Sequence, residues 1–233
     1  MKGLVDHLIA SEEELERELE QEYEGRKFPS MEHVTLLAIQ LSGKLTDEDI
    51  IDLYEIDMLK EWLRKFLKKD LIMHARYCLR QQQKVGFKTV SFLDVLTYPE
   101  VYKKEGNKRP VLLHYMGDLE LCDYNDKLCL GEAMERLAKD EFNGEWSDSV
   151  LVVGRWHSLS KSQKKAVSKW MEKGGQMIYF TCGWHDWDFI TDVRSHGGLV
   201  LSRTPLYKES FLEIDKMMDI TQSIKFDELL ELL

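Results

Sequence analysis

The 233-residue chain has few of the features that mark exported, membrane or cysteine-rich metal proteins. No apolar run approaches the roughly 18 residues that a membrane helix needs, and the acidic start MKGLVDHLIASEEELEREL is unlike a signal or transit peptide. We therefore expect a cytoplasmic protein with no membrane partner. The four cysteines never form a CxxC pair, which predicts reduced thiols rather than disulfides or a cysteine-ligated zinc.

Motifs for the commonest nucleotide and hydrolytic sites are also absent. The chain has no GxGxxG or GxxxxGK[ST] glycine loop, no GxSxG elbow and no HExxH zinc motif. A zinc site would draw on His185, His196 and a carboxylate such as Asp186 or Asp188, but their spacing matches no common ligand motif. We therefore predict that the protein is not an enzyme and that it carries no metal or other cofactor.

Hydrophobic spacing divides the chain into three parts. Helical periodicity in VTLLAIQL, IIDLYEIDMLKEWLRKFL and LIMHARYCL predicts a small helical N-terminal domain, residues 1–83. From 84 to 206, short β-type runs alternate with helical ones, which is typical of a parallel sheet with right-handed crossovers. The expected fold class is therefore α/β, with a trimmed Rossmann-like domain built on a mainly parallel sheet. Residues 207–233 predict a C-terminal helical tail.

The loops after the expected strands SVLVVG, MIYFT and LVLS gather candidate ligand-binding residues. Ligands of open parallel sheets bind beyond the carboxyl ends of the strands, near the point where strand order reverses. Guanidinium groups pair with phosphate and indole rings stack on bases, so this rim predicts a nucleotide or single-stranded nucleic-acid site. The alternative is that the tryptophans cover the sheet edge and the histidines bond loop backbone. The rim residues are Arg155, Trp156, His157, Trp184, His185, Trp187 and Arg203.

Charge restricts where a nucleic acid could bind. The formal net charge of −10 repels phosphate backbones overall, so binding requires basic residues gathered on one face. The segment SQKKAVSKWMEK predicts a helix that begins with a capping box between Ser160 and Gln163. On it, Lys161, Lys165 and Lys169 recur every four residues and predict a phosphate-binding stripe that does not read sequence. The alternative is a solvated helix face without a ligand.

Two stretches, residues 75–121 and 174–205, carry landmarks in a recognisable order. Together they resemble the DNA-processing protein A (DprA/Smf) family, in which a small helical domain precedes a Rossmann-like domain. The first stretch has the family's glycine, short strand, Tyr-Pro pair, proline and glycine-ended strand; the second has its Gly-Gly, apolar strand, Cys-Gly, helix, glycine and final strand. The matching landmarks are Gly86, Val90, Tyr98, Pro99, Pro110, Gly117, Gly174, Gly175, Cys182, Gly183, Gly198, Ser202 and Pro205.

The chain departs from the family at three places. KLCLG runs directly into the helix EAMERLAK where the family has a phosphate-binding loop, and GRWHSLSKSQKKAV replaces a conserved family segment. After Pro205 the expected Arg-Asn-Arg segment is absent, and the remaining residues do not fit a winged helix. The resemblance therefore indicates a reduced, divergent member of the family.

The resemblance implies a non-catalytic DNA-processing protein that binds single-stranded DNA during recombination or transformation. It implies a recombinase as a protein partner and leaves a homodimer open. Two other functions stay open beside it. One is a degenerate Rossmann scaffold that acts as a protein-interaction or regulatory module, and the other is a sensor of a nucleotide ligand.

Overall fold

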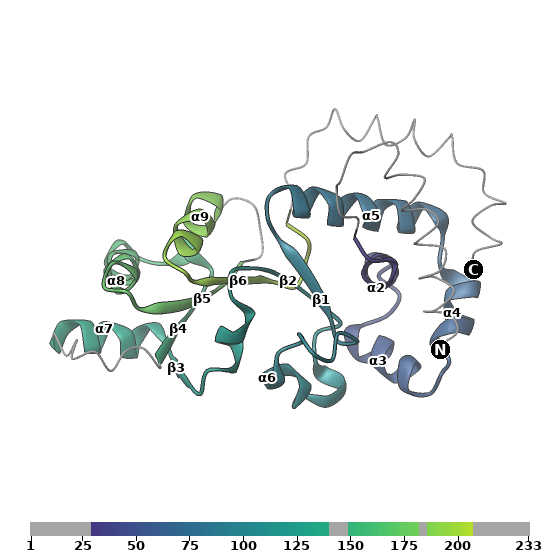
Figure 1. Ribbon diagram of the computed structural model, residues 1–233, viewed down its shortest axis with the longest axis horizontal. Helices are drawn as coiled ribbons and strands as arrows, with labels where there is room; N and C mark the ends of the chain where they lie inside the picture. The colour runs from purple at the N-terminus through teal and green to yellow at the C-terminus, as the bar shows by residue number, and fades with distance from the viewer. Residues whose placement is uncertain (1–28, 140–148, 182–185, 207–233) are drawn as a thin grey trace. The chain divides into compact units, whose positions relative to one another are not determined.

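The computed structural model describes residues 29–139, 149–181 and 186–206, which divide into two compact units (Figure 1). The helical unit comprises residues 29–85 and 106–112. The α/β unit comprises residues 86–105 and the described residues of 113–206. The expected C-terminal helical tail, 207–233, lies outside the described residues, as do Trp184 and His185.

The helical unit is built on well-capped, amphipathic helices. Thr46 and Asp49 form a reciprocal capping box at the start of α3, and Gly43, at a φ of +63°, follows the end of α2. Apolar residues of α2 and α5 are buried against each other. The expected helical N-terminal region is thus confirmed. Its helices are α2 (Met31–Leu41), α3 (Asp47–Glu55), α4 (Leu59–Phe66) and α5 (Lys69–Lys84), and it also contains the short η1 (Gly106–Lys108).

The α/β unit is built on a six-stranded sheet in the order β1-β2-β6-β5-β4-β3. β3, β4, β5 and β6 pair in parallel, whereas β2 pairs with β6 antiparallel. The sheet is therefore mainly parallel, and the expected α/β fold class is confirmed. The strands are β1 (Lys88–Ser91), β2 (Leu112–Met116), β3 (Asp126–Leu128), β4 (Ser149–Gly154), β5 (Gln176–Phe180) and β6 (Leu199–Ser202).

Each parallel strand lies beside the one that follows it in the chain. The helices α7 (Leu130–Lys139), α8 (Lys161–Glu172) and α9 (Trp187–Ser195) connect them in turn. Right-handed crossovers that all advance in the same direction place their helices on the same face of the sheet. Strand order does not reverse between β3 and β6, so the expected rim loops after β4 and β5 do not lie beside such a reversal.

The face opposite these helices packs against short helical turns. There η2 (Leu119–Asp123) buries Leu121 and Cys122 against the sheet, and α6 (Glu100–Lys103) lies beside it. Asp123 holds α6 in place, because its carboxylate accepts the backbone N–H groups of Glu100 and Val101 at 3.1 and 2.8 Å. Both sheet faces are thus covered, which leaves the sheet edges for function.

Two of the glycine landmarks meet in the fold. Gly117 follows β2 at a φ of +111°, and a Cβ atom added there would collide with the carbonyl oxygen of Gly198, just before β6. Only glycine permits both this backbone conformation and this close approach. In the described part of the chain, no helix has the length and apolar character of a membrane span.

Candidate functional site

The candidate site lies at the edge of the sheet where the parallel strands end. Arg155, Trp156 and His157 follow β4, Asp186 precedes α9 after β5, and Arg203 follows β6. Because the carboxyl ends of parallel strands meet at one edge, these loops are neighbours. The expected rim residues that fall within the described part of the chain therefore lie in neighbouring loops at one edge of the sheet.

A sharp turn after β4 fixes how the first rim loop leaves the sheet. Arg155 adopts the left-handed conformation, with φ +52° and ψ +54°, and its side chain is exposed. The backbone N–H and hydroxyl of Ser158 donate to the carbonyl oxygen of Arg155 at 2.9 and 2.8 Å, closing the short helix η4 (Trp156–Ser158). This backbone conformation costs a non-glycine residue about 1–2 kcal/mol, so the surrounding contacts must hold it.

Trp156 is one of those contacts, and its ring is largely occupied by the protein itself. The indole stacks on Phe189 of α9, with ring centroids 3.6 Å apart and planes within 1°. Lys164 Nζ lies over the same indole, 5.1 Å from its centroid. At least one face of Trp156 is therefore not available to a nucleobase, and this tryptophan serves mainly to join the β4 loop to α9.

Behind the rim lies a buried polar pair that sequence patterns do not reveal. Tyr179 of β5 donates its hydroxyl hydrogen to Asp186 Oδ2 at 2.5 Å, and the Asp186 side chain is only 4% exposed. Burial, together with the hydrogen bond to Asp186, raises the pKa of Tyr179, although hydrogen bonds from Thr181 and the Trp156 backbone oppose the shift. Tyr179 is therefore a neutral donor across the physiological pH range.

His157 connects this buried pair to the surface. Its Nδ1 atom lies 3.9 Å from Asp186 Oδ2, and its side chain is 54% exposed. The carboxylate thus faces a tyrosine on the buried side and an imidazole on the solvent side. A protonated His157 would present positive charge at the rim, where it would favour an anionic ligand.

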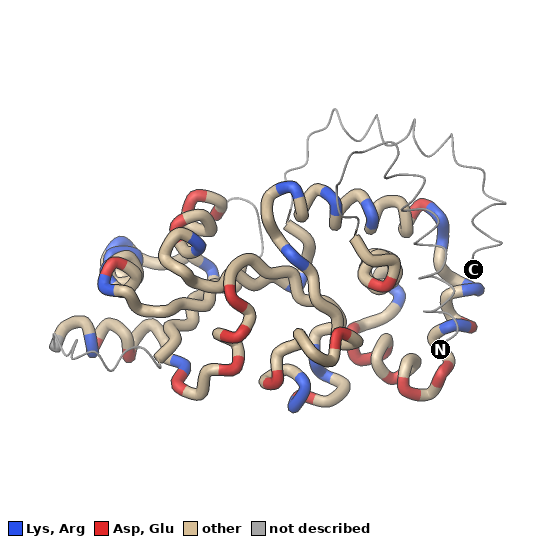
Figure 2. Tube along the Cα trace, viewed as in Figure 1, with Lys and Arg blue, Asp and Glu red and all other residues tan. Residues whose placement is uncertain are grey.

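The basic stripe on α8 is formed as the sequence predicts. The Ser160 backbone donates to Gln163 Oε1 at 2.9 Å and the Gln163 backbone donates to Ser160 Oγ at 3.3 Å, which completes the predicted capping box. On the outer face Lys161, Lys165 and Lys169 are exposed, and basic residues gather along α8 (Figure 2). Among the described residues, none of these three lysines forms an ion pair.

The inner face of α8 holds the stripe rigidly against the sheet. Val167, Trp170 and Met171 are buried, as their helical spacing predicts. The Trp170 indole N–H donates to the Gln176 carbonyl oxygen at 2.9 Å, which ties the end of the helix to the start of β5. The three lysines thus stand on a helix whose orientation is fixed by burial.

Trp187 and Arg203 follow β5 and β6, outside α8. Trp187 is the first residue of α9 and half-buried, so the prediction that it belongs to the rim loop is wrong. The cause is that the helix begins one residue earlier than the charged sequence suggests, with Asp186 at its N-cap position. Arg203 is exposed in the turn after β6. The described residues thus show an exposed basic stripe on α8, while Trp184 and His185 of the expected rim lie outside the described residues.

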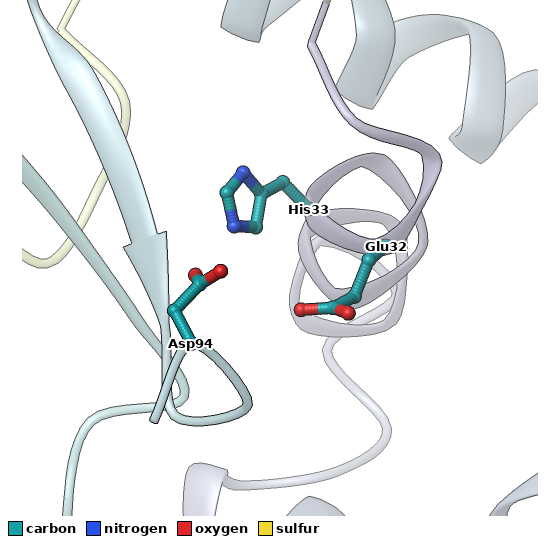
Figure 3. A group of neighbouring side chains, drawn as sticks. All are labelled: Glu32, His33 and Asp94. Atoms are coloured by element: carbon teal, nitrogen blue, oxygen red, sulfur yellow. The ribbon is translucent and has the colours of Figure 1, made fainter. Parts of the chain in front are cut away.

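Of the residues considered for a zinc site, His185 lies outside the described residues, and His196 and Asp186 have partners of their own. His196 Nδ1 lies 3.4 Å from Asp192 Oδ1 within α9 and its C-cap, whereas Asp186 is bonded to Tyr179. Figure 3 shows Glu32 and His33, which belong to α2 of the helical unit, and Asp94, which belongs to the turn after β1 of the α/β unit. Since that set draws on both units, we assign no metal to it.

Asp94 has a structural role in its own unit. Its carboxylate accepts the backbone N–H of Ser91 at 2.6 Å and the Ser91 hydroxyl at 3.0 Å, which closes the turn after β1. His33 likewise takes part in helix capping, because its backbone N–H donates to Ser30 Oγ at 3.2 Å.

Comparison with known proteins identifies no relative: no protein-family model, no curated protein and no solved structure matches the chain. The chain is an α/β protein with a mainly parallel sheet.

Proposed function

We propose that the chain is a DprA-like, non-catalytic protein that binds single-stranded DNA through the outer face of α8. The observation that carries this proposal is the basic stripe of Lys161, Lys165 and Lys169, which is exposed and free of ion pairs among the described residues of an acidic chain. Lysines left without carboxylate partners on a protein of net charge −10 leave a local positive field that an external polyanion can neutralise.

The geometry suits a phosphate backbone better than a base. Residues four apart on a helix are separated by about 6 Å along its axis, so the three ammonium groups form an extended row rather than a pocket. Such a row contacts successive phosphates and does not read sequence. Base stacking on Trp156 receives less support, because Phe189 already covers one of its faces. The nucleotide-sensor alternative also relies on Trp184 and His185, which lie outside the described residues.

Two features favour the DprA-like form of the proposal. A helical region precedes a mainly parallel sheet, as the resemblance implies, and the landmark glycines Gly117 and Gly198 approach each other closely. After β3, a single residue separates the strand from α7, which agrees with the missing phosphate-binding loop. A role in recombination or transformation, with a recombinase as partner, follows from the resemblance alone and forms part of the proposal.

Fluorescence anisotropy with a labelled oligothymidylate tests the proposal. We expect salt-sensitive binding by the full chain, and a variant carrying Lys161→Gln, Lys165→Gln and Lys169→Gln should lose affinity about 10- to 100-fold at about 50 mM salt. The control variant replaces Lys104, Lys108 and Lys127 by glutamine, which removes the same charge from exposed positions elsewhere. Equal affinities of the two variants, or no binding by the full chain, would overturn the proposal.

The salt dependence gives a second readout. Each phosphate contact to a single strand contributes about 0.7 to the slope of log K against log salt, so the α8 variant should lose about 2 units of slope between about 50 and 200 mM salt. The control variant should keep the parent slope.

A further inference from the structure

A second surface with basic and aromatic side chains lies on α4, in the helical unit. The helix buries Leu59 and Leu63 and leaves Trp62 and Phe66 half-exposed on one flank of the buried stripe. Their rings lie one turn apart, with centroids 5.4 Å apart and planes inclined by 42°. Both rings are packed in part and keep part of their surface in solvent, whereas the two leucines are buried.

A lysine from a different segment is brought to the same rings. Lys44 lies in the turn between α2 and α3, where its backbone N–H donates to Ser42 Oγ at 3.2 Å and Ser42 Oγ donates to the Ile39 carbonyl oxygen at 2.6 Å. This turn places Lys44 Nζ 4.8 Å from the centroid of the Phe66 ring. Lys65 Nζ lies 5.3 Å from the same centroid. Two ammonium groups therefore converge on one ring.

The charge around this ring is not balanced by carboxylates. Among the described residues, Lys44 and Lys65 form no ion pair, and Glu61 is the sole acidic residue of α4. Lys60 and Arg64 add positive charge on the other flank of the helix. Both ammonium groups contact the same ring, so an external anion that bound beside Phe66 would be attracted by the two positive charges.

We propose that Lys44, Trp62, Lys65 and Phe66, which we call the α4 surface, form a second contact for single-stranded nucleic acid. The choice of single-stranded nucleic acid as the ligand rests on the proposed function, whereas the α4 surface shares no residue with the α8 stripe. Lysines pair with phosphates, and the partly exposed Trp62 can stack on a base; Phe66, whose ring the two ammonium groups already contact, holds them beside Trp62. The α8 stripe lacks this aromatic component.

An anionic membrane is the other polyanion that basic and aromatic side chains attract. α4 is less suited to it, because the helix has only eight residues and turns both of its leucines, Leu59 and Leu63, into the core of its unit. Ile56 and Met58 are exposed in the preceding turn, so binding to vesicles of phosphatidylserine and phosphatidylcholine is measured in parallel.

The experiment compares two variants of the full chain by anisotropy with labelled oligothymidylate. Trp62→Leu removes the stacking surface and should weaken binding about 5-fold or more. The pair Lys44→Gln and Lys65→Gln should lower the salt slope by about 1.4, whereas the matched pair Lys104→Gln and Lys108→Gln should leave it unchanged. Far-UV circular dichroism establishes whether each variant is folded. If Trp62→Leu does not fold, the Lys44→Gln and Lys65→Gln variant still tests the proposal.

The outcomes separate this proposal from the proposed function. Loss of affinity in the α4 variants but not in the α8 variant would support the α4 surface and overturn the α8 stripe. Loss in the α8 variant alone would overturn the α4 surface and leave the proposed function in place. Absence of binding by the full chain overturns both. Vesicle binding that Trp62→Leu abolishes, with unchanged oligothymidylate affinity, also overturns the α4 surface.

Discussion

The buried pair of Tyr179 and Asp186 predicts that a single oxygen atom contributes measurably to stability. Tyr179→Phe keeps the ring, which packs edge-on against Phe189 with centroids 4.9 Å apart, and removes only the hydroxyl. Asp186 then loses a donor at 2.5 Å while its carboxylate stays buried. Removing this donor weakens the hydrogen bonding of a buried carboxylate, and hydrogen bonds to charged groups contribute about 1.5–3 kcal/mol.

This loss corresponds to a clear change in melting temperature. For a chain of this size, 1 kcal/mol shifts Tm by about 2–4 °C, so Tyr179→Phe should lower Tm by about 3–12 °C at pH 7. The matched control is Tyr124→Phe, which removes the same atom from an exposed tyrosine and should shift Tm by less than about 1 °C. Thermal unfolding followed by circular dichroism measures both.

The pH dependence has a definite sign. Because the pKa of Tyr179 is raised in the folded state, the unfolded chain ionises first, and the stabilisation is complete below about pH 10 and declines as pH rises above it. The parent should therefore lose up to about 1.4 kcal/mol per pH unit through Tyr179, a loss that the variant lacks. Tyr102 and Tyr115, whose pKa values are also raised, occur in both proteins and cancel in the comparison. Equal stability of variant and parent at pH 7 would refute the reasoning.

Two further predictions concern backbone geometry and thiol reactivity. Gly117→Ala should lower the free energy of unfolding by more than about 2 kcal/mol in urea titrations, because its Cβ atom would collide with Gly198. The control Gly106→Ala, also at positive φ but in open space, should lower it by only about 1 kcal/mol. Equal losses would show that the close approach of Gly117 and Gly198 is unimportant. Burial raises the pKa of the Cys122 thiol to about 12, so iodoacetamide at pH 8 should modify the exposed Cys129 well before Cys122. Peptide mass mapping measures the order of modification. The reverse order would contradict the burial of Cys122 in η2.

Features set by local sequence could be predicted. The capping box of Ser160 and Gln163 and the lysine stripe of α8 depend on residues within a few positions of one another, so helical spacing is enough to place them. The alternation of apolar strands and helices likewise indicates the mainly parallel sheet.

Features set by distant contacts could not be predicted. The sequence predicts that Trp156 stacks on a base, but in the structure Phe189, from α9, covers one face of its ring. Asp186 reads as an exposed carboxylate in a tryptophan-rich segment, and only the approach of Tyr179 from β5 shows that it is buried and bonded. Strand order also depends on which strands pair, a choice that periodicity within one segment does not encode.

The strand order has a consequence for how the α/β unit folds. β3, β4, β5 and β6 each pair with the next strand in the chain, so their loops close over short sequence separations. β2 pairs with β6 through His114 and Ser202, which requires the intervening chain to be closed into one long loop. Closing a shorter loop costs less entropy, so we expect the four parallel strands to pair before β2 joins β6. The antiparallel strand β2, and with it the meeting of Gly117 and Gly198, would complete the sheet last.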